Sequence, residues 1–329
     1  MSPYFHRAVV TGGAGFVGSH VCERLLAAGT QVACVDNLVT GATRNIAHLM
    51  DDTAFRFVDA DVSAGLGAVG GVAVDLVLHL ACPASPRDYL RFPVETLEVG
   101  AAGTRHALDL AVAHHARFVL ASTSEVYGDP HEHPQRESYW GNVNPVGPRS
   151  VYDEGKRYAE ALTTAYRTAR GADTAIARIF NTYGPRMRPG DGRMIPTFIN
   201  QALAGDPMTV TGDGKQTRSV CYVDDTVSGL LALATIPVPG PVNIGNPHEL
   251  PVRDLAQKIQ DMTSSRSRIC YVPAPEDDPR RRCPDITKAR TELGWSPQVS
   301  LREGLGRTID WFLAESEEEG ALAESRFEE

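Results

Sequence analysis

The sequence predicts an α/β protein built on a doubly wound parallel sheet, with a second, smaller mixed α/β domain. Over the first 125 residues, short apolar runs alternate with segments of helical apolar spacing, which is typical of a parallel sheet covered by helices on both faces. After Asn181 the chain becomes rich in Gly, Pro and Arg and then continues as short mixed strands and helices. A length of 329 residues is enough for both parts.

The strands of the main domain are predicted from apolar runs that end in small or polar residues. They span residues 7–13, 31–37, 55–62, 74–81 and 116–124, with a sixth candidate at 174–181. Residues 16–29 have apolar side chains at helical spacing, and Gly29 fits a helix C-cap. A second helical segment runs from Tyr152 to about Arg170. Strand and helix thus alternate as a doubly wound fold requires.

The predicted domain boundaries follow the change in amino-acid composition after Asn181. We place the first domain at residues 1–182, a substrate domain mainly at 183–313, and an acidic tail at 314–329, with segments near 221–247 returning to the first domain. Further strands are predicted at 208–212, 218–223, 241–246 and 268–274, and further helices at 224–234 and 252–262. The tail has seven Glu and one Arg, and we expect it to be a solvated, frayed terminus.

Composition limits the class of partner. The chain is 42% apolar and 22% charged, as soluble globular proteins are. It has 41 Asp and Glu against 32 Lys and Arg, a net charge of -9, so the basic excess of a nucleic-acid-binding protein is missing. No apolar run approaches the roughly 18 residues of a membrane span, and the first residues lack the apolar core of a signal peptide. We expect no nucleic-acid partner and no membrane association.

The cysteines and histidines give no sign of a disulfide framework or a metal site. The six cysteines form no CxxC pair, so they are predicted to be free thiols in a reducing, cytoplasmic location. His131 and His133 flank Glu132 in a loop, but no further ligands stand nearby in the sequence, so no metal is expected.

A dinucleotide site is predicted where the first strand meets the first helix. Residues 11–18 read TGGAGFVG, and glycines there permit a tight turn and close approach of backbone N–H groups to a pyrophosphate. Asp36 ends the second predicted strand eighteen residues after Gly18, where its carboxylate can accept hydrogen bonds from a ribose and repel a 2′-phosphate. This Rossmann-like pattern favours NAD over NADP. The alternative is a glycine-rich turn that only lets helix and strand pack closely.

The predicted cofactor-binding residues extend beyond the glycines to the ends of neighbouring strands and to the second helix. They are Gly12, Gly15, Phe16, Val17, Gly18, Asp36, Asn37, Thr40, Gly41, Asp61, Val62, Leu80, Tyr152 and Lys156.

A candidate catalytic group lies in the second half of the first domain. Tyr152 and Lys156 are one helical turn apart on one face. An ammonium near a phenol favours the phenolate, so Lys156 is expected to lower the pKa of Tyr152 and make it a base. Thr123 and Glu125 follow the fifth strand, at the edge where a doubly wound sheet binds its ligands.

These residues resemble the extended short-chain dehydrogenase/reductase family that acts on nucleotide sugars, and within it the UDP-glucuronic acid decarboxylases. The stretch from Thr123 to Arg157, TSEVYGDPHEHPQRESYWGNVNPVGPRSVYDEGKR, matches the pattern of that branch almost residue for residue. Further similar segments are 84–86, 178–187, 190–193, 212–218, 243–247 and 277–286. The resemblance covers roughly residues 5–313.

The resemblance implies the roles of the site residues. Tyr152 would be the base, Lys156 its partner and Thr123 the hydroxyl at the sugar O4, while Glu125 would act near C5 and Arg282 would face the sugar carboxylate. UDP-glucuronic acid would be oxidised at C4, lose its C6 carboxylate as CO2, and be reduced to UDP-xylose or released as the 4-keto-pentose. The implied substrate-binding residues are Ser124, Asn181, Arg193, Arg218, Asn243 and Arg282. A homodimer is also implied.

Three alternatives remain open. The related 4,6-dehydratases have Asp where this chain has Ser124, and serine is too weak an acid to expel a hydroxyl group. The 4-epimerases usually lack the glutamate at the position of Glu125. A catalytically silent NAD-binding regulator is the third alternative, and the intact Thr123, Tyr152 and Lys156 weigh against it.

Five positions depart from the family pattern. Gly100 and His106 each stand where asparagine is typical, Cys82 replaces a serine, Arg87 adds a charge, and Val220 replaces an aromatic residue. Because these changes lie near the predicted site, they leave open whether the final reduction is efficient.

Overall fold

A seven-stranded parallel sheet forms the centre of the molecule. The computed structural model describes residues 4–69, 71, 73–274 and 279–325. The strand order is β3-β2-β1-β4-β5-β6-β11, and every neighbouring pair is parallel. The strands are β1 (Arg7–Thr11), β2 (Gln31–Asp36), β3 (Phe55–Asp59), β4 (Leu76–His79), β5 (Arg117–Thr123), β6 (Thr174–Ile179) and β11 (Pro241–Ile244). The predicted doubly wound fold is confirmed, and its strand order reverses between β1 and β4.

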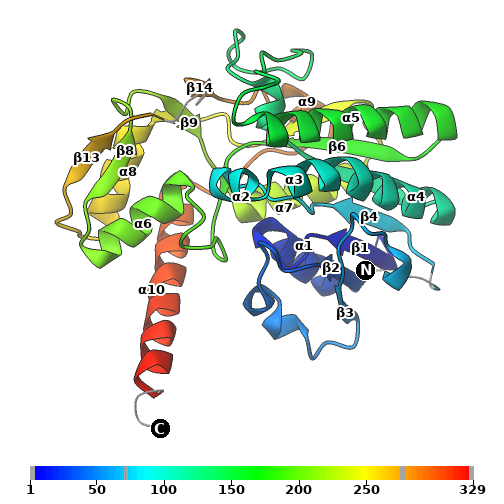
Figure 1. Cartoon of the computed structure of the whole chain (residues 1–329), viewed down its shortest axis with the longest axis horizontal. Coiled ribbons are helices and arrows are strands. Elements are labelled where there is room, and N and C mark those ends of the chain that lie inside the picture. The colour runs from blue at the N-terminus through cyan, green and yellow to red at the C-terminus, as the bar shows by residue number, and fades with distance from the viewer. Residues whose placement is uncertain (1–3, 70, 72, 275–278, 326–329) are drawn as a thin grey trace.

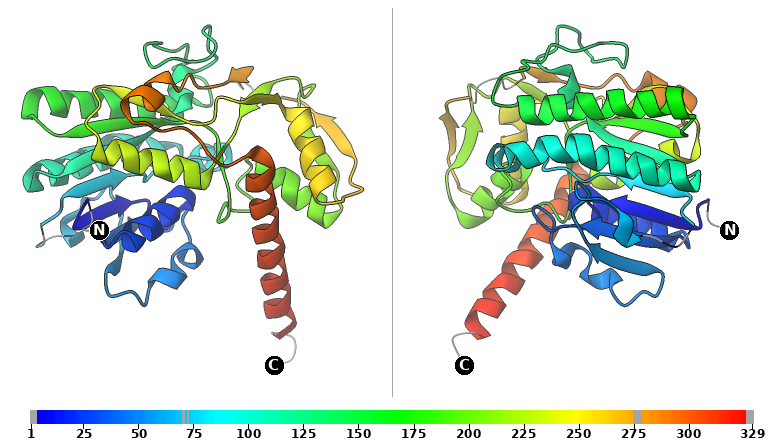
Figure 2. Two further views of the ribbon diagram at one scale, coloured as in Figure 1. Left: turned by 180° about the vertical axis from the view of Figure 1, so that it is seen from behind. Right: turned by 45° about the vertical axis from the view of Figure 1, so that its right-hand side comes forward.

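Helices cover both faces of this sheet (Figures 1 and 2). Alternate residues of a strand point to opposite faces, so Ala8 and Val10 of β1 pack with α1 and α7, whereas Val9 packs with α4 and α5. The helices are α1 (Phe16–Ala27), α2 (Pro86–Arg91), α3 (Pro93–Glu98), α4 (Thr104–His114), α5 (Ser150–Arg170), α6 (Met194–Ala204), α7 (Val223–Thr235), α8 (Val252–Met262), α9 (Thr287–Glu292) and α10 (Leu301–Ser325). Short helical turns are η1 (Thr43–Asn45), η2 (Ala47–Leu49), η3 (Gly67–Val69), η4 (Val99–Gly103) and η5 (Ser124–Tyr127).

The second part of the chain forms three small sheets beside the main one. The pairs are β13 with β8, β10 with β7, and β12 and β14 on either side of β9. Their bounds are β7 (Thr182–Tyr183), β8 (Met208–Thr211), β9 (Thr217–Ser219), β10 (Cys221–Tyr222), β12 (Glu249–Pro251), β13 (Ile269–Val272) and β14 (Arg281–Arg282). Helices α6 and α8 pack together beside them. Between β10 and β12 the chain returns to the main sheet as α7 and β11.

The six strands predicted for the first domain each end one to three residues earlier than the sequence predicted. β3 ends at Asp59 and β4 at His79, so Asp61, Val62 and Leu80 follow the strands instead of closing them. These residues still line the cavity described below, because the carboxyl ends of parallel strands meet at one edge of the sheet.

The acidic tail begins as a helix, which corrects the expectation of a frayed terminus over residues 314–329. α10 continues to Ser325 and projects away from both domains in Figures 1 and 2. Leu305, Ile309 and Phe312 bury its first half in the core, so the tail extends a helix that is already anchored. Glu315 forms an ion pair with Arg44 at 3.2 Å. Residues 326–329 lie outside the described residues. No helix in the described part of the chain is both long and apolar enough to cross a bilayer.

Asp225 ties the segment before α10 to helix α7. It is buried in the first turn of α7, and its two carboxylate oxygens accept hydrogen bonds from the backbone N–H groups of Gln298 and Val299, both at 2.9 Å. Hydrogen bonds to a charged acceptor stabilise more than neutral ones, and removing the acceptor leaves two partly buried donors unpaired.

We therefore expect Asp225→Ala to lower the free energy of unfolding by about 2–4 kcal/mol. The neighbouring Asp224→Ala removes only a half-exposed ion pair with Arg307 and should cost under about 1 kcal/mol. Urea unfolding of the two variants measures the difference, and equal destabilisation by both would contradict the anchoring role of Asp225.

Candidate active site

A cavity of about 1110 Å³ lies at the carboxyl ends of the central strands, between the seven-stranded sheet and the small sheets. Its lining includes the glycine-rich turn after β1, the end of β5, the start of α5 and the segment before α6. Ligand cavities in proteins are commonly about 300–1,000 Å³, so this one lies above the usual range for a single small ligand. Its position at the reversal of strand order is where open α/β sheets bind ligands.

The glycine-rich turn forms a cradle that side chains would fill. A Cβ added at Gly18 would lie 2.1 Å from the Gly12 carbonyl oxygen, and Gly12 itself has a φ of 71°. Helix α1 begins at Phe16 with no side-chain cap on its N-terminus and no acidic residue in its first turn. The N–H groups of that turn therefore remain available to an anion. Phe16 and Val17 line the cavity beside them.

Asp36 binds the turn and faces the cavity. Its carboxylate accepts hydrogen bonds from the N–H groups of Ala14 at 3.0 Å and Leu38 at 2.9 Å, one on each oxygen. Burial raises the pKa of Asp36, while these backbone hydrogen bonds lower it. Each oxygen keeps a second lone pair, so a ribose can still bind. The other predicted cofactor residues that line the cavity are Asn37, Thr40, Gly41, Asp61, Val62 and Leu80.

The site is deep enough that Tyr152 is almost wholly buried. Its ring stacks on that of Tyr89 with centroids 5.2 Å apart and planes 10° apart. Burial raises the pKa of Tyr152, and its hydrogen bond with Thr123 opposes the rise. The expectation that Lys156 lowers this pKa is wrong for the chain alone, because the Lys156 Nζ donates to the Ala121 carbonyl at 2.8 Å and burial dominates.

Glu125 is the charged centre of the opposite wall. Its Oε2 accepts hydrogen bonds from Arg149 at 2.6 Å and from Arg282 at 3.0 Å. Burial favours the protonated form of Glu125, but the two arginines outweigh it and lower the pKa to about 2. The glutamate is therefore ionised throughout the neutral range.

Four of the six predicted substrate residues line the cavity, namely Ser124, Asn181, Arg193 and Arg218. Arg282 does not: only 1% of it is exposed, and it donates to Glu125 and to the Ser124 carbonyl oxygen. In this structure it therefore supports Glu125 instead of facing the sugar carboxylate.

Asn243 also lies outside the cavity, which corrects its predicted role in substrate binding. It is fully buried, and its side-chain amide donates to the carbonyl oxygens of Gln135 and Asp285 at 2.9 and 3.0 Å. Its Oδ1 accepts the Tyr127 hydroxyl at 2.8 Å. All three contacts are internal, so Asn243 connects loops to β11.

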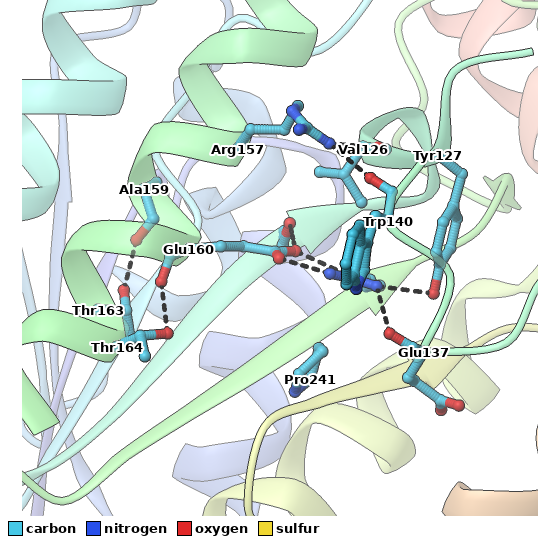
Figure 3. Close-up of polar contacts among 12 residues, drawn as sticks. Val126, Tyr127, Glu137, Trp140, Arg157, Ala159, Glu160, Thr163, Thr164 and Pro241 are labelled. Atoms are coloured by element: carbon cyan, nitrogen blue, oxygen red, sulfur yellow. Dashed lines mark hydrogen bonds and ion pairs between the residues drawn. The ribbon is translucent and has the colours of Figure 1, made fainter. Parts of the chain in front are cut away.

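A buried ion pair between α5 and β6 holds the helix that carries Tyr152 and Lys156 (Figure 3). Glu160 accepts two hydrogen bonds from Arg178, at 2.9 and 2.8 Å, and a third from the Ser122 hydroxyl at 2.6 Å. Arg178 also donates to the Tyr127 hydroxyl at 3.0 Å. Because Ser122 immediately precedes Thr123 on β5, the pair fixes α5 against the strand end at the cavity.

Sequence reasoning missed Arg149 and Tyr89. Arg149 lines the cavity and stands three residues before Tyr152, a spacing that places both on one helix face. That spacing was a usable signal for Arg149. The stacking of Tyr89 depends on how α2 packs against α5, for which the local sequence holds no pattern.

The departures from the family pattern have distinct surroundings. A Cβ at Gly100 would lie 3.0 Å from the Gly155 carbonyl oxygen, so η4 and α5 approach closely there. His106 contacts the Val62 carbonyl oxygen at 2.9 Å, and Arg87 donates to the Gly190 carbonyl oxygen at 2.7 Å. Cys82 and Val220 line the cavity. The segment 277–286 that carries Arg282 begins with two residues outside the described residues.

Comparison with known proteins places this geometry in a family. The model of the NAD dependent epimerase/dehydratase family matches residues 8–245. UDP-glucuronic acid decarboxylase 1 of Danio rerio is 49% identical over 94% of this chain and 73% of its own length. UDP-glucuronic acid decarboxylase 1 of Arabidopsis thaliana is 50% identical over 93% of this chain and 69% of its own.

Solved structures agree with the fold. An epimerase from Methanothermobacter thermautotrophicus is 31% identical, with a TM-score of 0.88 over 95% of this chain and 93% of that one. A mutant UDP-glucuronic acid 4-epimerase from Bacillus cereus, crystallised with NAD and a fluorinated UDP-glucuronic acid, is 28% identical, with a TM-score of 0.83 over 93% of this chain and 98% of that one. The chain belongs to the NAD dependent epimerase/dehydratase family.

Proposed function

We propose that this protein is a UDP-glucuronic acid decarboxylase, a carboxy-lyase that uses NAD and releases CO2. The observation that carries the proposal is a cavity lined by the Tyr152 and Thr123 pair and by Glu125 and Arg149, with the buried Arg282 supporting Glu125 from behind. The first group suits oxidation of a sugar hydroxyl, and the second supplies positive charge for an acidic sugar. Relatives about half identical over nine-tenths of the chain are named for this activity.

The residues fit NAD on two observations. The cradle at Gly12 and Gly18 has no room for a Cβ, and the N-terminus of α1 has no side-chain cap, so a pyrophosphate can approach the backbone. Asp36 has lone pairs left for the ribose hydroxyls. When bound, NAD would supply a hydride acceptor for the sugar C4 and a positive charge on its nicotinamide ring.

The chain itself supplies the proton transfers. Because burial raises the pKa of Tyr152, its phenolate forms only when positive charge is close to it. The Tyr152 oxygen then takes the proton of the sugar 4-hydroxyl. The Thr123 side chain, which is hydrogen-bonded to Tyr152, holds the Tyr152 oxygen in place. Lys156, fixed on the Ala121 carbonyl, keeps a further positive charge on this helix face.

Loss of CO2 follows from the position of the ketone. A carbonyl at C4 places the C6 carboxylate β to it, so the C5–C6 electron pair passes into an enolate as CO2 leaves. Protonation at C5 restores the ketone. Its reduction before release gives UDP-xylose, and earlier release gives UDP-4-keto-pentose.

Ser124 argues against a dehydratase. Ser124 belongs to the cavity lining and stands between Thr123 and Glu125 in the sequence, and a serine cannot act as the acid that expels a hydroxyl group. A 4-epimerase is the second candidate, favoured by the fold shared with the Bacillus cereus epimerase. The two activities differ in the fate of the carboxylate.

We also propose that two copies of the chain associate through α2, α3 and α5. Leu90, Val94, Leu97 and Tyr158 on these helices are between 43% and 61% exposed. Helices α2 and α3 pack on α5, so these apolar side chains lie on neighbouring elements.

We further propose that the protein is located in a reducing compartment such as the cytoplasm, since all six cysteines are free thiols.

The activity is tested with purified protein and UDP-glucuronic acid. We expect CO2 release, and we expect Tyr152→Phe to reduce it by about 10²–10⁴-fold because the proton acceptor is lost. Tyr158→Phe, on the exposed side of the same helix, should leave it unchanged. Absence of CO2 release by wild-type protein with NAD bound would refute the proposed function.

Product analysis separates the second candidate. NMR of the products from UDP-glucuronic acid should show a UDP-pentose or its 4-ketone and no retained C6. A product that keeps its carboxylate with inverted C4 would establish a 4-epimerase instead.

Association is tested by sedimentation. Leu97→Asp on α3 should convert a dimer to a monomer, because a charge would be buried without a partner in the contact. Leu313→Asp on α10 is an equally exposed control and should not change the mass. A wild-type monomer, or a dimer that withstands Leu97→Asp, would contradict this surface.

A further inference from the structure

A short segment of the chain, residues 185–188, connects α1 to α2 beside the cavity, and we call it the strap. It lies between β7 and α6 in the sequence, and Arg186, Met187 and Arg188 belong to the cavity lining. The reaction described above uses none of these residues. Segments that close over a ligand site often control how ligands enter and leave it.

The first half of the strap is fixed to α1. The Nε2 of His20 donates to the Pro185 carbonyl oxygen at 3.0 Å, and Arg186 donates to Glu23 at 2.6 Å. Arg186 has a φ of 68°, and the next residue, Met187, is buried. A residue other than glycine keeps a left-handed backbone only where its surroundings hold it there. This end of the strap is therefore an anchor with little freedom to move.

The second half of the strap is held to α2 by side chains that solvent reaches. The Arg188 Nη2 donates to both carboxylate oxygens of Asp88, each at 2.6 Å. Asp88 is in the first turn of α2 and also accepts the Ser85 hydroxyl at 2.7 Å. Just beyond the strap, the Gly190 carbonyl oxygen accepts a hydrogen bond from Arg87 at 2.7 Å. The Arg188 side chain is 39% exposed, so this end can open by breaking one ion pair and one hydrogen bond.

The strap spans the crevice where the cofactor is expected. Helix α1 follows β1 and α2 follows β4, and these are the neighbouring strands between which the strand order reverses. Open α/β sheets bind their ligands outside the carboxyl ends of such a pair. The glycine-rich turn lies there too, since a Cβ at Gly12 would stand 2.7 Å from the backbone nitrogen of Ala81, just after β4. A ligand in this crevice is bounded by the turn and by the strap, because both line the same cavity.

We propose that the strap retains NAD, and that the ion pair between Arg188 and Asp88 is the latch that sets how fast the cofactor leaves. The anchor at α1 stays in place, while the latch at α2 opens and lets the dinucleotide out of the crevice. Asp88 is only 10% exposed, and an ion pair withdrawn from water on one side is stronger than one on an open surface. This role concerns the cofactor alone and does not depend on which sugar the site converts.

Asp88 distinguishes a latch from a direct cofactor ligand. If Arg188 bound the pyrophosphate of NAD instead, neutralising Asp88 would free the arginine for the phosphates and slow the release of NAD. In a latch, changing either partner makes opening easier and speeds release. Asp88→Asn is the decisive variant, because it keeps the size of the side chain and its amide oxygen can still accept the Ser85 hydroxyl.

The test follows the release of isotope-labelled NAD from the full-length protein during a chase with unlabelled NAD. We expect Arg188→Ala and Asp88→Asn each to speed release at least about tenfold, because a charge-assisted hydrogen bond is lost. The double variant should release NAD no faster than either single variant, since all three lack the same pair. Arg170→Ala removes an exposed ion pair with Asp109 at the end of α5 and should leave the release rate unchanged.

Ionic strength provides a readout that a purely structural role would not move. Salt screens a partly exposed ion pair, so it should speed release from the wild-type protein more than from either single variant. Thermal unfolding followed by circular dichroism reports whether the variants are folded. A wild-type release rate in Arg188→Ala or Asp88→Asn, additive effects in the double variant, or an equal salt effect in all proteins would overturn the latch. Slower release from Asp88→Asn would overturn it too, and would make Arg188 a ligand of the cofactor.

Discussion

The attachment of helix α5 to strands β5 and β6 is the interaction on which the site depends. Lys156 reaches the Ala121 carbonyl oxygen, and Glu160, one turn later, binds both Ser122 and Arg178. Every contact is buried or nearly so, where electrostatic attraction is strong and a broken pair is costly. Tyr152 shares this helix, so these contacts between α5 and the two strands set the distance between Tyr152 and Thr123.

Around this frame, charge and burial divide the chemistry. Tyr152 stacks on Tyr89 in one wall, where burial raises the pKa of the phenol and favours its protonated form. The wall with Glu125 concentrates Arg149 and Arg282 around one carboxylate. Such fixed, buried dipoles and charges stabilise charge that develops during a reaction. An acidic sugar between these walls meets a base on one side and positive charge on the other.

Local sequence predicted the parts of the molecule that depend on local rules. The alternation of strands and helices in the first domain, the turn from Gly12 to Gly18 and the end of β5 follow from apolar periodicity and glycine spacing. Long-range contacts were not predictable in this way: Asn243 and Arg282 prove to be interior supports, because segments far apart in sequence enclose them. The pKa of Tyr152 was predicted with the wrong sign because its burial depends on α2.

The most direct test of this account is the effect of Glu160→Gln on CO2 release from UDP-glucuronic acid. Glutamine keeps the size of the side chain but removes the charge that holds Arg178 and Ser122. We predict that kcat falls at least about tenfold while bound NAD is retained, because α5 loses its register against β5 and the phosphate cradle at α1 is untouched. Wild-type kcat in a folded Glu160→Gln protein would contradict the claim that this ion pair positions the site.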